Sequence, residues 1–121
     1  MIDGIRFISE NYERVNNLND REIYKELYHP DILWCPPGLP DKAGVDLVAF
    51  SFALKNFDIK VEILELEGIN GETLSYVTGL CRVDTFSKDG EPRETFILRG
   101  SWVVVLYDGE PKIRYQVWNR K

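Results

Sequence analysis

Arg82 and Asp84 are separated by one residue within a run rich in strand-forming residues, and this spacing is the clearest chemical signal in the chain. Side chains alternate along a strand, so both would project from one face, close enough for a charge-assisted hydrogen bond. The guanidinium would hold Asp84 ionised, as a general base requires, with Arg82 orienting the reacting group. An exposed ion pair on the convex side of a sheet fits the spacing equally well.

Further candidate site residues are aromatic or polar side chains that a strand or helix could turn toward a ligand. Tryptophans in a strand-rich domain more often fill a core or a dimer interface, so a pocket role for Trp34 and Trp118 competes with that alternative. The candidate ligand-binding residues are Trp34, Tyr76, Arg99, Gln116 and Trp118.

No metal or cofactor site is expected. The single histidine, His29, precedes Pro30 at a predicted turn, where a local hydrogen bond explains it. Cys35 and Cys81 lie among apolar residues without a CxxC spacing, so we expect small buried hydrophobes and neither a disulfide framework nor a zinc site. The glutamates between 62 and 67 are more typical of a solvated strand face than of a calcium site.

Composition predicts a single globular domain spanning residues 1–121, because 44% of the residues are hydrophobic and 29% are charged. The net charge of −5 disfavours binding to nucleic acid or to an anionic membrane surface. Charged residues interrupt the first eighteen positions, so we expect no signal peptide or membrane span and a cytoplasmic location.

Three amphipathic helices are predicted in the first half of the chain. Apolar residues at positions 5, 8, 12 and 15 recur at helical spacing. Asn19 and Glu22 form a capping-box pattern for a second, shorter helix that His29-Pro30 should end. After a short strand at 32–35 and a proline-rich loop, a third helix should run from about Val45 to about Asn56.

Four long antiparallel strands are predicted after Asp58. Asn-Gly or Asp-Gly turn signals at 70–71, 89–90 and 108–109 separate runs rich in β-branched and aromatic residues. Two of these runs contain an internal glycine, Gly79 and Gly100, where long strands usually bend. A bent sheet cannot close completely against covering helices, so we expect a tapering cavity between them.

The order of elements resembles the SnoaL-like and ketosteroid-isomerase-like branch of the nuclear transport factor 2-like superfamily. The resemblance implies an α+β, cone-shaped fold of three N-terminal helices packed on a strongly curved, mainly antiparallel sheet. It also implies a homodimer through the sheet, which the apolar character of both sheet faces favours. The residues that carry it are Leu27-Tyr28-His29-Pro30-Asp31, Trp34, Pro36-Pro37, Gly44 to Phe50, Arg99-Gly100-Ser101-Trp102, Asp108-Gly109 and Lys112-Ile113 through Trp118-Asn119.

Two enzyme patterns within that superfamily can be compared residue by residue. Tyr12 fits the tyrosine of the steroid isomerases, but their base and second acid correspond to Pro36 and Val103, so steroid isomerisation is not expected. Arg82-Val83-Asp84 resembles the Arg-Val-Asp element of limonene epoxide hydrolase, although the second aspartate of that enzyme corresponds to Gln116 or Trp118.

Three functional hypotheses follow. The first is a protein that binds a small hydrophobic molecule in the cavity. The second is a hydrolase or isomerase of a small terpenoid, polyketide or epoxide, with Asp84 as base, Arg82 as orienter and Tyr12 as hydrogen-bond donor. The third is a non-catalytic dimeric structural or adaptor module whose own side chains fill the cavity.

Overall fold

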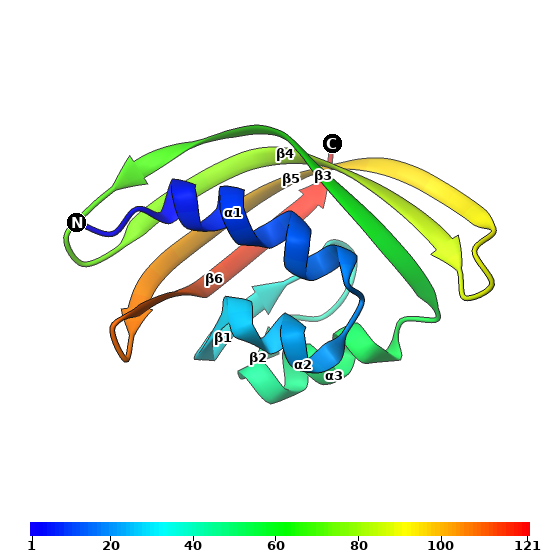
Figure 1. The fold of residues 1–121 in the computed structure, drawn as a ribbon, viewed down its shortest axis with the longest axis horizontal. Helices are drawn as coiled ribbons and strands as arrows, with labels where there is room; N and C mark the ends of the chain where they lie inside the picture. The colour runs from blue at the N-terminus through cyan, green and yellow to red at the C-terminus, as the bar shows by residue number, and fades with distance from the viewer.

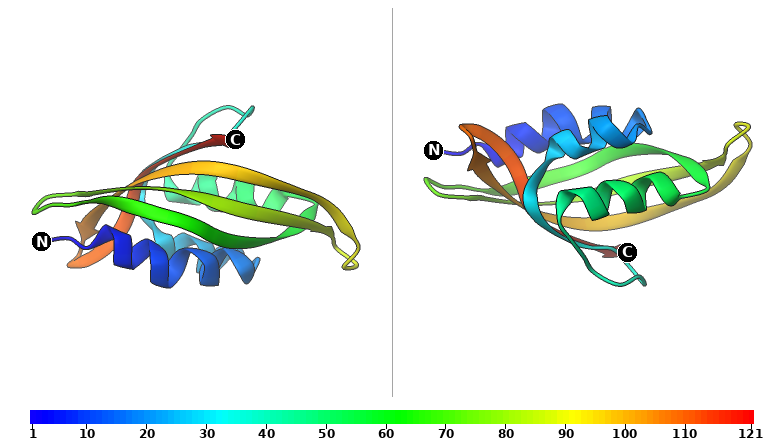
Figure 2. Two further views of the ribbon diagram at one scale, coloured as in Figure 1. Left: turned by 90° about the horizontal axis from the view of Figure 1, so that it is seen from above. Right: turned by 90° about the horizontal axis from the view of Figure 1, so that it is seen from below.

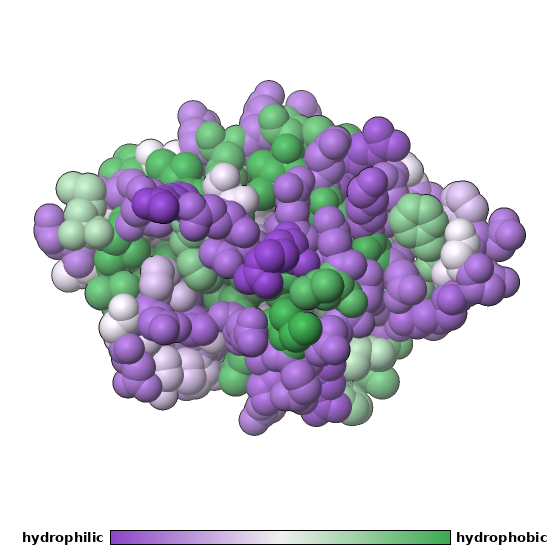
Figure 3. All heavy atoms as spheres, viewed as in Figure 1, coloured by the Kyte–Doolittle hydropathy of each residue, from purple (hydrophilic) through white to green (hydrophobic).

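The first helix, α1 (Gly4–Asn17), begins where the side chain of Asp3 accepts a hydrogen bond from the backbone N–H of Arg6. A computed structural model describes all residues from 1 to 121. Ile8, Tyr12 and Val15 are buried on one side of α1, as the helical spacing predicts. Hydrophilic side chains cover the opposite, solvent side (Figure 3). The helix therefore contributes one apolar face to the core.

The second helical segment is shorter than a typical helix and has a different cap from the predicted one. It consists of α2 (Arg21–Tyr24) followed by the 3₁₀ turn η1 (Lys25–Leu27). Asp20, and not Asn19, caps α2 by accepting from the backbone N–H groups of Glu22 and Ile23. Asn19 has a φ of 52° and bonds with its side chain to the backbone of Ile59. The capping residue is thus displaced by one position.

A strand follows the second helical segment directly. β1 (Tyr28–Cys35) begins before His29-Pro30 and is longer than the predicted strand at 32–35. Pro30 lacks an N–H and cannot continue a helix, which fits its place at the beginning of this strand. The proline-rich loop then leads through the two-residue strand β2 (Lys42–Ala43) to α3 (Val45–Leu54).

The remaining chain forms the predicted antiparallel meander of four long strands, β3 (Phe57–Asn70), β4 (Ser75–Ser87), β5 (Pro92–Tyr107) and β6 (Glu110–Arg120). The spatial order of the sheet is β2-β1-β6-β5-β4-β3. β1 pairs in parallel with β6, and all other neighbours are antiparallel. The sheet arches over the helices (Figure 1), and seen from below the three helices lie in front of it (Figure 2). The fold class predicted from the sequence is confirmed.

The bend of the sheet passes through a pair of facing glycines. Gly79 in β4 lies opposite Gly100 in β5, next to a β-bulge in β3 between Ile63 and Glu65. A Cβ atom added at Gly79 would lie 2.3 Å from the carbonyl oxygen of Glu65. No side chain larger than hydrogen fits there, so the close approach of β3 to β4 depends on this glycine.

The concave face of the sheet packs against the helices and the convex face is turned to solvent. In β4, Val77, Cys81 and Val83 are buried on the concave face, and Tyr76 is 42% exposed on the convex one. Strand alternation alone places Ile113 and Gln116 on opposite faces of β6. A register shift between β5 and β6 at Val103 and Val104 changes this, and Ile113 and Gln116 are both buried.

Candidate ligand-binding cavity

A cavity of about 460 Å³ opens between the helices and the concave face of the sheet. Thirteen of its nineteen lining residues are hydrophobic. They come from α1, α2, β1, α3 and the three strands β3, β4 and β5, together with the end of β6. The lining residues are Tyr12, Asn16, Tyr24, Trp34, Pro36, Pro37, Leu39, Ser51, Phe52, Leu54, Lys55, Phe57, Ile59, Val61, Val83, Phe96, Leu98, Trp118 and Arg120.

The inner end of the cavity narrows toward Trp102. A further hollow of about 20 Å³ there shares Tyr12, Val83 and Trp118 with the main cavity and adds Cys81 and Trp102. Burial, with a smaller contribution from Glu13, raises the pKa of the Cys81 thiol to about 12. The thiol is therefore neutral at ordinary pH and has little nucleophilic character.

A buried hydrogen-bond network connects three tyrosines through Gln116, which is 1% exposed. The side-chain nitrogen of Gln116 donates to the hydroxyl of Tyr12 at 3.2 Å, and its oxygen accepts from the hydroxyl of Tyr28 at 2.8 Å. The hydroxyls of Tyr28 and Tyr24 are 2.8 Å apart. Tyr12 and Tyr24 line the cavity, so the network forms part of its polar wall.

This polar wall offers hydrogen-bond donors. Burial raises the pKa of Tyr24 to about 12, and it raises the pKa values of Tyr12 and Tyr28 well above their usual value, so all three stay protonated. The indole N–H groups of Trp34 and Trp102 are buried without a partner of acceptable hydrogen-bond geometry. A carbonyl or carboxylate oxygen on a bound molecule would match this surplus of donors.

The entrance of the cavity lies beside the proline-rich loop and the end of α3. Leu39 and Leu54 are 64% and 65% exposed there, whereas Trp34 is 8% exposed. Lys55 follows α3 and donates from Nζ to the side-chain oxygen of Asn19 and the carbonyl of Phe57. Burial, followed by the charge of nearby Lys88, lowers the pKa of Lys55.

The structure brings four of the sequence-predicted site residues together. Tyr12, Trp34 and Trp118 line the cavity, and Gln116 lies behind its wall in contact with Tyr12. The rings of Trp34 and Trp118 meet edge to face with their centroids 5.0 Å apart. The parallel pairing of β1 with β6 makes this contact, since Trp34 is opposite Gln116 in the register.

Arg82 and Asp84 lie elsewhere, on the convex face of β4. Val83 between them points into the cavity, so its neighbours point away from it. Their side chains are 50% and 24% exposed, with 3.3 Å between Arg82 Nε and Asp84 Oδ1. Hydrogen bonds from Thr95 and Arg82 lower the pKa of Asp84, which weakens it as a base. Asp84 does not line the cavity.

Tyr76 and Arg99 also point away from the cavity. The hydroxyl of Tyr76 lies 3.2 Å from Ser101 Oγ on the convex face, and Arg99 lines a shallow polar depression on that face beside Thr78. The prediction that these two side chains contact a ligand in the cavity is therefore not supported. Val103 also lies on the convex face. Its neighbour Trp102 is the β5 residue that lines the small hollow at the inner end of the cavity.

Sequence reasoning missed Tyr24, Tyr28 and Lys55. The two tyrosines are four positions apart, which is a helical spacing, but the structure ends the helix between them and joins their hydroxyls across the turn. Lys55 directly follows α3 and has no sequence feature that distinguishes it from a solvated lysine.

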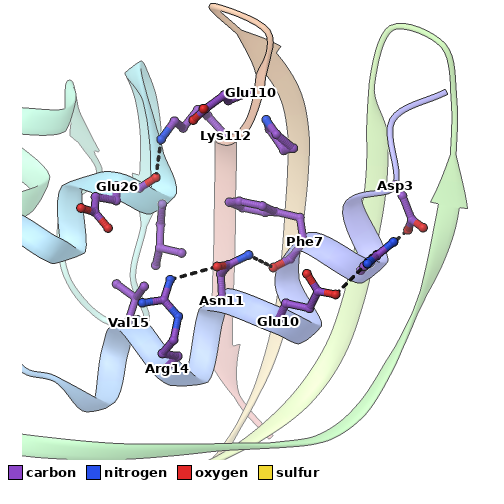
Figure 4. Close-up of a pocket in the computed structure, with 12 residues that line it drawn as sticks. Asp3, Phe7, Glu10, Asn11, Arg14, Val15, Glu26, Glu110 and Lys112 are labelled. Atoms are coloured by element: carbon purple, nitrogen blue, oxygen red, sulfur yellow. Dashed lines mark hydrogen bonds and ion pairs between the residues drawn. The ribbon is translucent and has the colours of Figure 1, made fainter.

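A second hollow, between α1, η1 and the start of β6, is wider and more polar (Figure 4). Several of its charged side chains already have partners. Arg6 donates to Glu10 at 2.7 Å, Arg14 donates to Asn11, and Lys112 donates to the carbonyl oxygen of Glu26. These exposed contacts satisfy one another, so the groove offers a bound molecule little besides solvated charge.

Neither a membrane span nor a metal site is found. None of the helices combines the length and the apolar character needed to cross a bilayer. No cluster of three or more His, Cys, Asp or Glu side chains is placed to hold a metal ion.

No protein-family model matches the sequence, and no curated protein matches it. Solved structures do match along nearly the whole chain. A nuclear transport factor 2-like superfamily protein from Salmonella enterica serovar Typhimurium superposes with a TM-score of 0.82 at 14% identity, covering 94% of this chain and 88% of that one.

Two further solved structures give the same result. A protein with a cystatin-like fold from Caulobacter vibrioides has a TM-score of 0.80 at 19% identity, covering 97% of this chain and 87% of that one. A ketosteroid isomerase-like protein from Erwinia carotovora atroseptica has a TM-score of 0.78 at 16% identity, covering 96% and 92%. The chain therefore has the cone-shaped fold of the nuclear transport factor 2-like superfamily.

Proposed function

We propose that this protein binds a small hydrophobic molecule in the cavity between its helices and its curved sheet. The observation that supports this most strongly is the open cavity of about 460 Å³ with a mainly hydrophobic lining. Ligand sites are usually concave, mostly apolar and of this size, with a few convergent polar groups that orient the ligand. Tyr12 and Tyr24, held by Gln116 and Tyr28, are such groups.

Binding is favoured over catalysis because the cavity lacks an evident base. Its lining contains no Asp, Glu or His, and the Cys81 thiol at its inner end has a pKa raised to about 12. Hydrolysis or isomerisation of a terpenoid, polyketide or epoxide needs a group that accepts a proton at working pH. The phenol of Tyr12 could polarise a carbonyl, but Tyr12 and Tyr24 both hold their protons too tightly to act as a base.

A fluorescence titration with N-phenyl-1-naphthylamine, a neutral apolar probe, tests the proposal. Val83 is buried and lines the cavity, so Val83→Phe places a ring in the space that a ligand would occupy. We expect the probe to bind the unaltered protein and the Val83→Phe variant to lose most of this binding. Ile69→Phe is the matched control, because Ile69 is 74% exposed and lies outside the cavity.

Equal binding by both variants would place the probe outside the cavity and contradict the proposal. If the probe does bind in the cavity, a thermal-shift screen against steroids, terpenoids and epoxides would identify the class of ligand. A ligand present at a hundredfold its dissociation constant should add about 2.7 kcal/mol to the free energy of unfolding. Failure of every apolar compound to bind would leave the structural or adaptor role as the remaining hypothesis.

The convex face of the sheet supports the proposal of a homodimer. Leu64, Tyr76, Tyr115 and Val117 are each between 42% and 51% exposed on that face. Exposed apolar groups gathered on one face commonly mark a protein interface. We expect light scattering to give the mass of a dimer, and Val117→Glu to shift it to a monomer. If light scattering shows that the unaltered protein is a monomer at micromolar concentration, this proposal is contradicted.

A further inference from the structure

The charged groups at the cavity are all of one sign. Lys55 and Arg120 line it, and no acidic residue does. The chain as a whole carries a net charge of −5, so a cationic entrance is not a consequence of its average composition. The electrostatic character of the entrance is therefore a local property of these two residues.

Lys55 is a half-buried ammonium group without an acidic partner. Its Nζ donates to Asn19 Oδ1 at 2.9 Å and to the carbonyl oxygen of Phe57 at 3.0 Å, and it lies 4.4 Å from the centroid of the Phe52 ring. All three partners are neutral. An ammonium group has three donors, so one remains for a further acceptor.

The carboxylates nearest to this entrance are engaged elsewhere. Asp58 pairs with Lys88 at 2.8 Å, and Glu94 pairs with Arg120 at 3.3 Å across an exposed surface. Phe96, which lines the cavity, lies 4.3 Å from the guanidinium of Arg120. Lys55 thus makes no direct ion pair, which is uncommon for a partly desolvated charge, and the negative charge of nearby Asp58 offsets the effect of burial on its pKa only in part.

We propose that the molecule held in the cavity is an amphipathic anion, with an apolar body in the interior and one carboxylate, sulfonate or similar group bound by Lys55 at the entrance. This inference rests on the proposed function, because it specifies the ligand of the same cavity. Burial also lowers the pKa of Lys55, as expected for an ammonium group without a direct ion pair. An anion at the entrance would supply that pairing.

Two fluorescent probes with the same ring system test this inference. 1-Anilinonaphthalene-8-sulfonate carries one sulfonate, and N-phenyl-1-naphthylamine is its neutral counterpart. We expect the anionic probe to bind about five- to tenfold more tightly, the range for a partly buried ion pair. The measured quantity is the ratio of the two dissociation constants, from which contributions of the shared apolar body cancel.

Lys55→Met should bring this ratio close to one, and Lys55→Arg, which keeps the charge, should preserve most of it. Lys60→Met is the matched control, because Lys60 precedes the cavity-lining Val61 in β3 and points to the convex face. Stronger competition by decanoate than by decanol for the neutral probe would extend the result to carboxylates.

The outcomes separate the two proposals. Suppose that the neutral probe binds and Val83→Phe blocks its binding. If the anionic probe is then not preferred, or is still preferred after Lys55→Met, an anionic ligand held by Lys55 is excluded and the proposed function stands. If neither probe binds the unaltered protein, the proposed function is overturned and this inference with it.

Discussion

The hydroxyl of Tyr28 donates to the side-chain oxygen of Gln116 across 2.8 Å in the interior of the protein. A phenol has a single proton, and Tyr28 uses its proton for Gln116. The hydrogen bond between the hydroxyls of Tyr28 and Tyr24, which are 2.8 Å apart, must therefore use the proton of Tyr24. Gln116 in turn donates to Tyr12. In this arrangement the proton of Tyr12 has no acceptor in the protein and is available to a molecule in the cavity.

Replacement of Gln116 should destabilise the protein. Gln116→Leu leaves the buried hydroxyls of Tyr12 and Tyr28 without their shared partner, and each unsatisfied group costs about 1–3 kcal/mol. We expect the free energy of unfolding in urea to fall by roughly 2–4 kcal/mol. Asn119→Leu, at an exposed position of the same strand, should change it by less than about 0.5 kcal/mol. Equal effects of both changes would count against the network.

Gly79→Ala should distort the bend of the sheet. The new Cβ would lie 2.3 Å from the carbonyl oxygen of Glu65, so the backbone of β3 or β4 must move. A loss of about 1–3 kcal/mol is expected in urea unfolding, with weaker binding of the neutral probe because the cavity wall shifts. Unchanged stability and probe binding would show that the bend does not depend on this glycine.

Alkaline pH should destabilise the folded state. The pKa of Cys81 rises from 9.0 to about 12 and that of Tyr24 from 10.0 to about 12 on folding. As the pH rises, the unfolded chain loses these protons before the folded protein does. The contribution of the two groups to the free energy of unfolding is therefore fully present below pH 9 and declines toward pH 12. The free energy of unfolding should fall by about 1.4 kcal/mol per pH unit for each group that titrates in the unfolded state.

Urea unfolding between about pH 8 and pH 11 measures this decline. The Tyr24→Phe variant provides the control, because it lacks one of the titrating phenols and should show a shallower decline above pH 10. A free energy of unfolding that is constant over this range would contradict the assignment of buried, protonated groups.

Asp84→Asn should leave ligand binding unaffected. Asp84 points to the convex face, where Thr95 and Arg82 hold it, and the sheet separates it from the cavity. The dissociation constant of the neutral probe should therefore change by less than about twofold, as for a site without shared contacts. A large loss of binding would return Asp84 to the list of cavity residues.

The elements of this fold could be predicted from local patterns. The spacing of Ile8, Tyr12 and Val15 predicts α1 because one helical face must be apolar to pack on the sheet. Gly79 and Gly100 predict the bend, and the structure has no room for a Cβ atom at either position, since it would meet the backbone of Glu65 at Gly79 and the ring of Trp102 at Gly100. The Asp-Gly turn before β6 forms as predicted, with φ of 52° at Asp108 and 80° at Gly109.

The face on which each strand residue lies could not be predicted equally well. Leu80 is 7% exposed although it lies on the convex face with Arg82 and Asp84, so hydrophobicity does not distinguish the two faces of β4. In β6 the register shift overrides simple alternation and turns both Ile113 and Gln116 inward. The cavity also depends on β1 pairing with β6, a long-range contact that no local pattern encodes.

The parallel pairing of the first strand with the last also has a consequence for biosynthesis. Tyr28 and Gln116 are 88 positions apart, so a ribosome must release the intervening segment as far as Gln116 before their contact can form. Until then the indole of Trp34 lacks its Trp118 neighbour and remains open to chaperones or to other nascent chains. Folding should be slow for a domain of this size, since distant segments must meet before the interior is sealed.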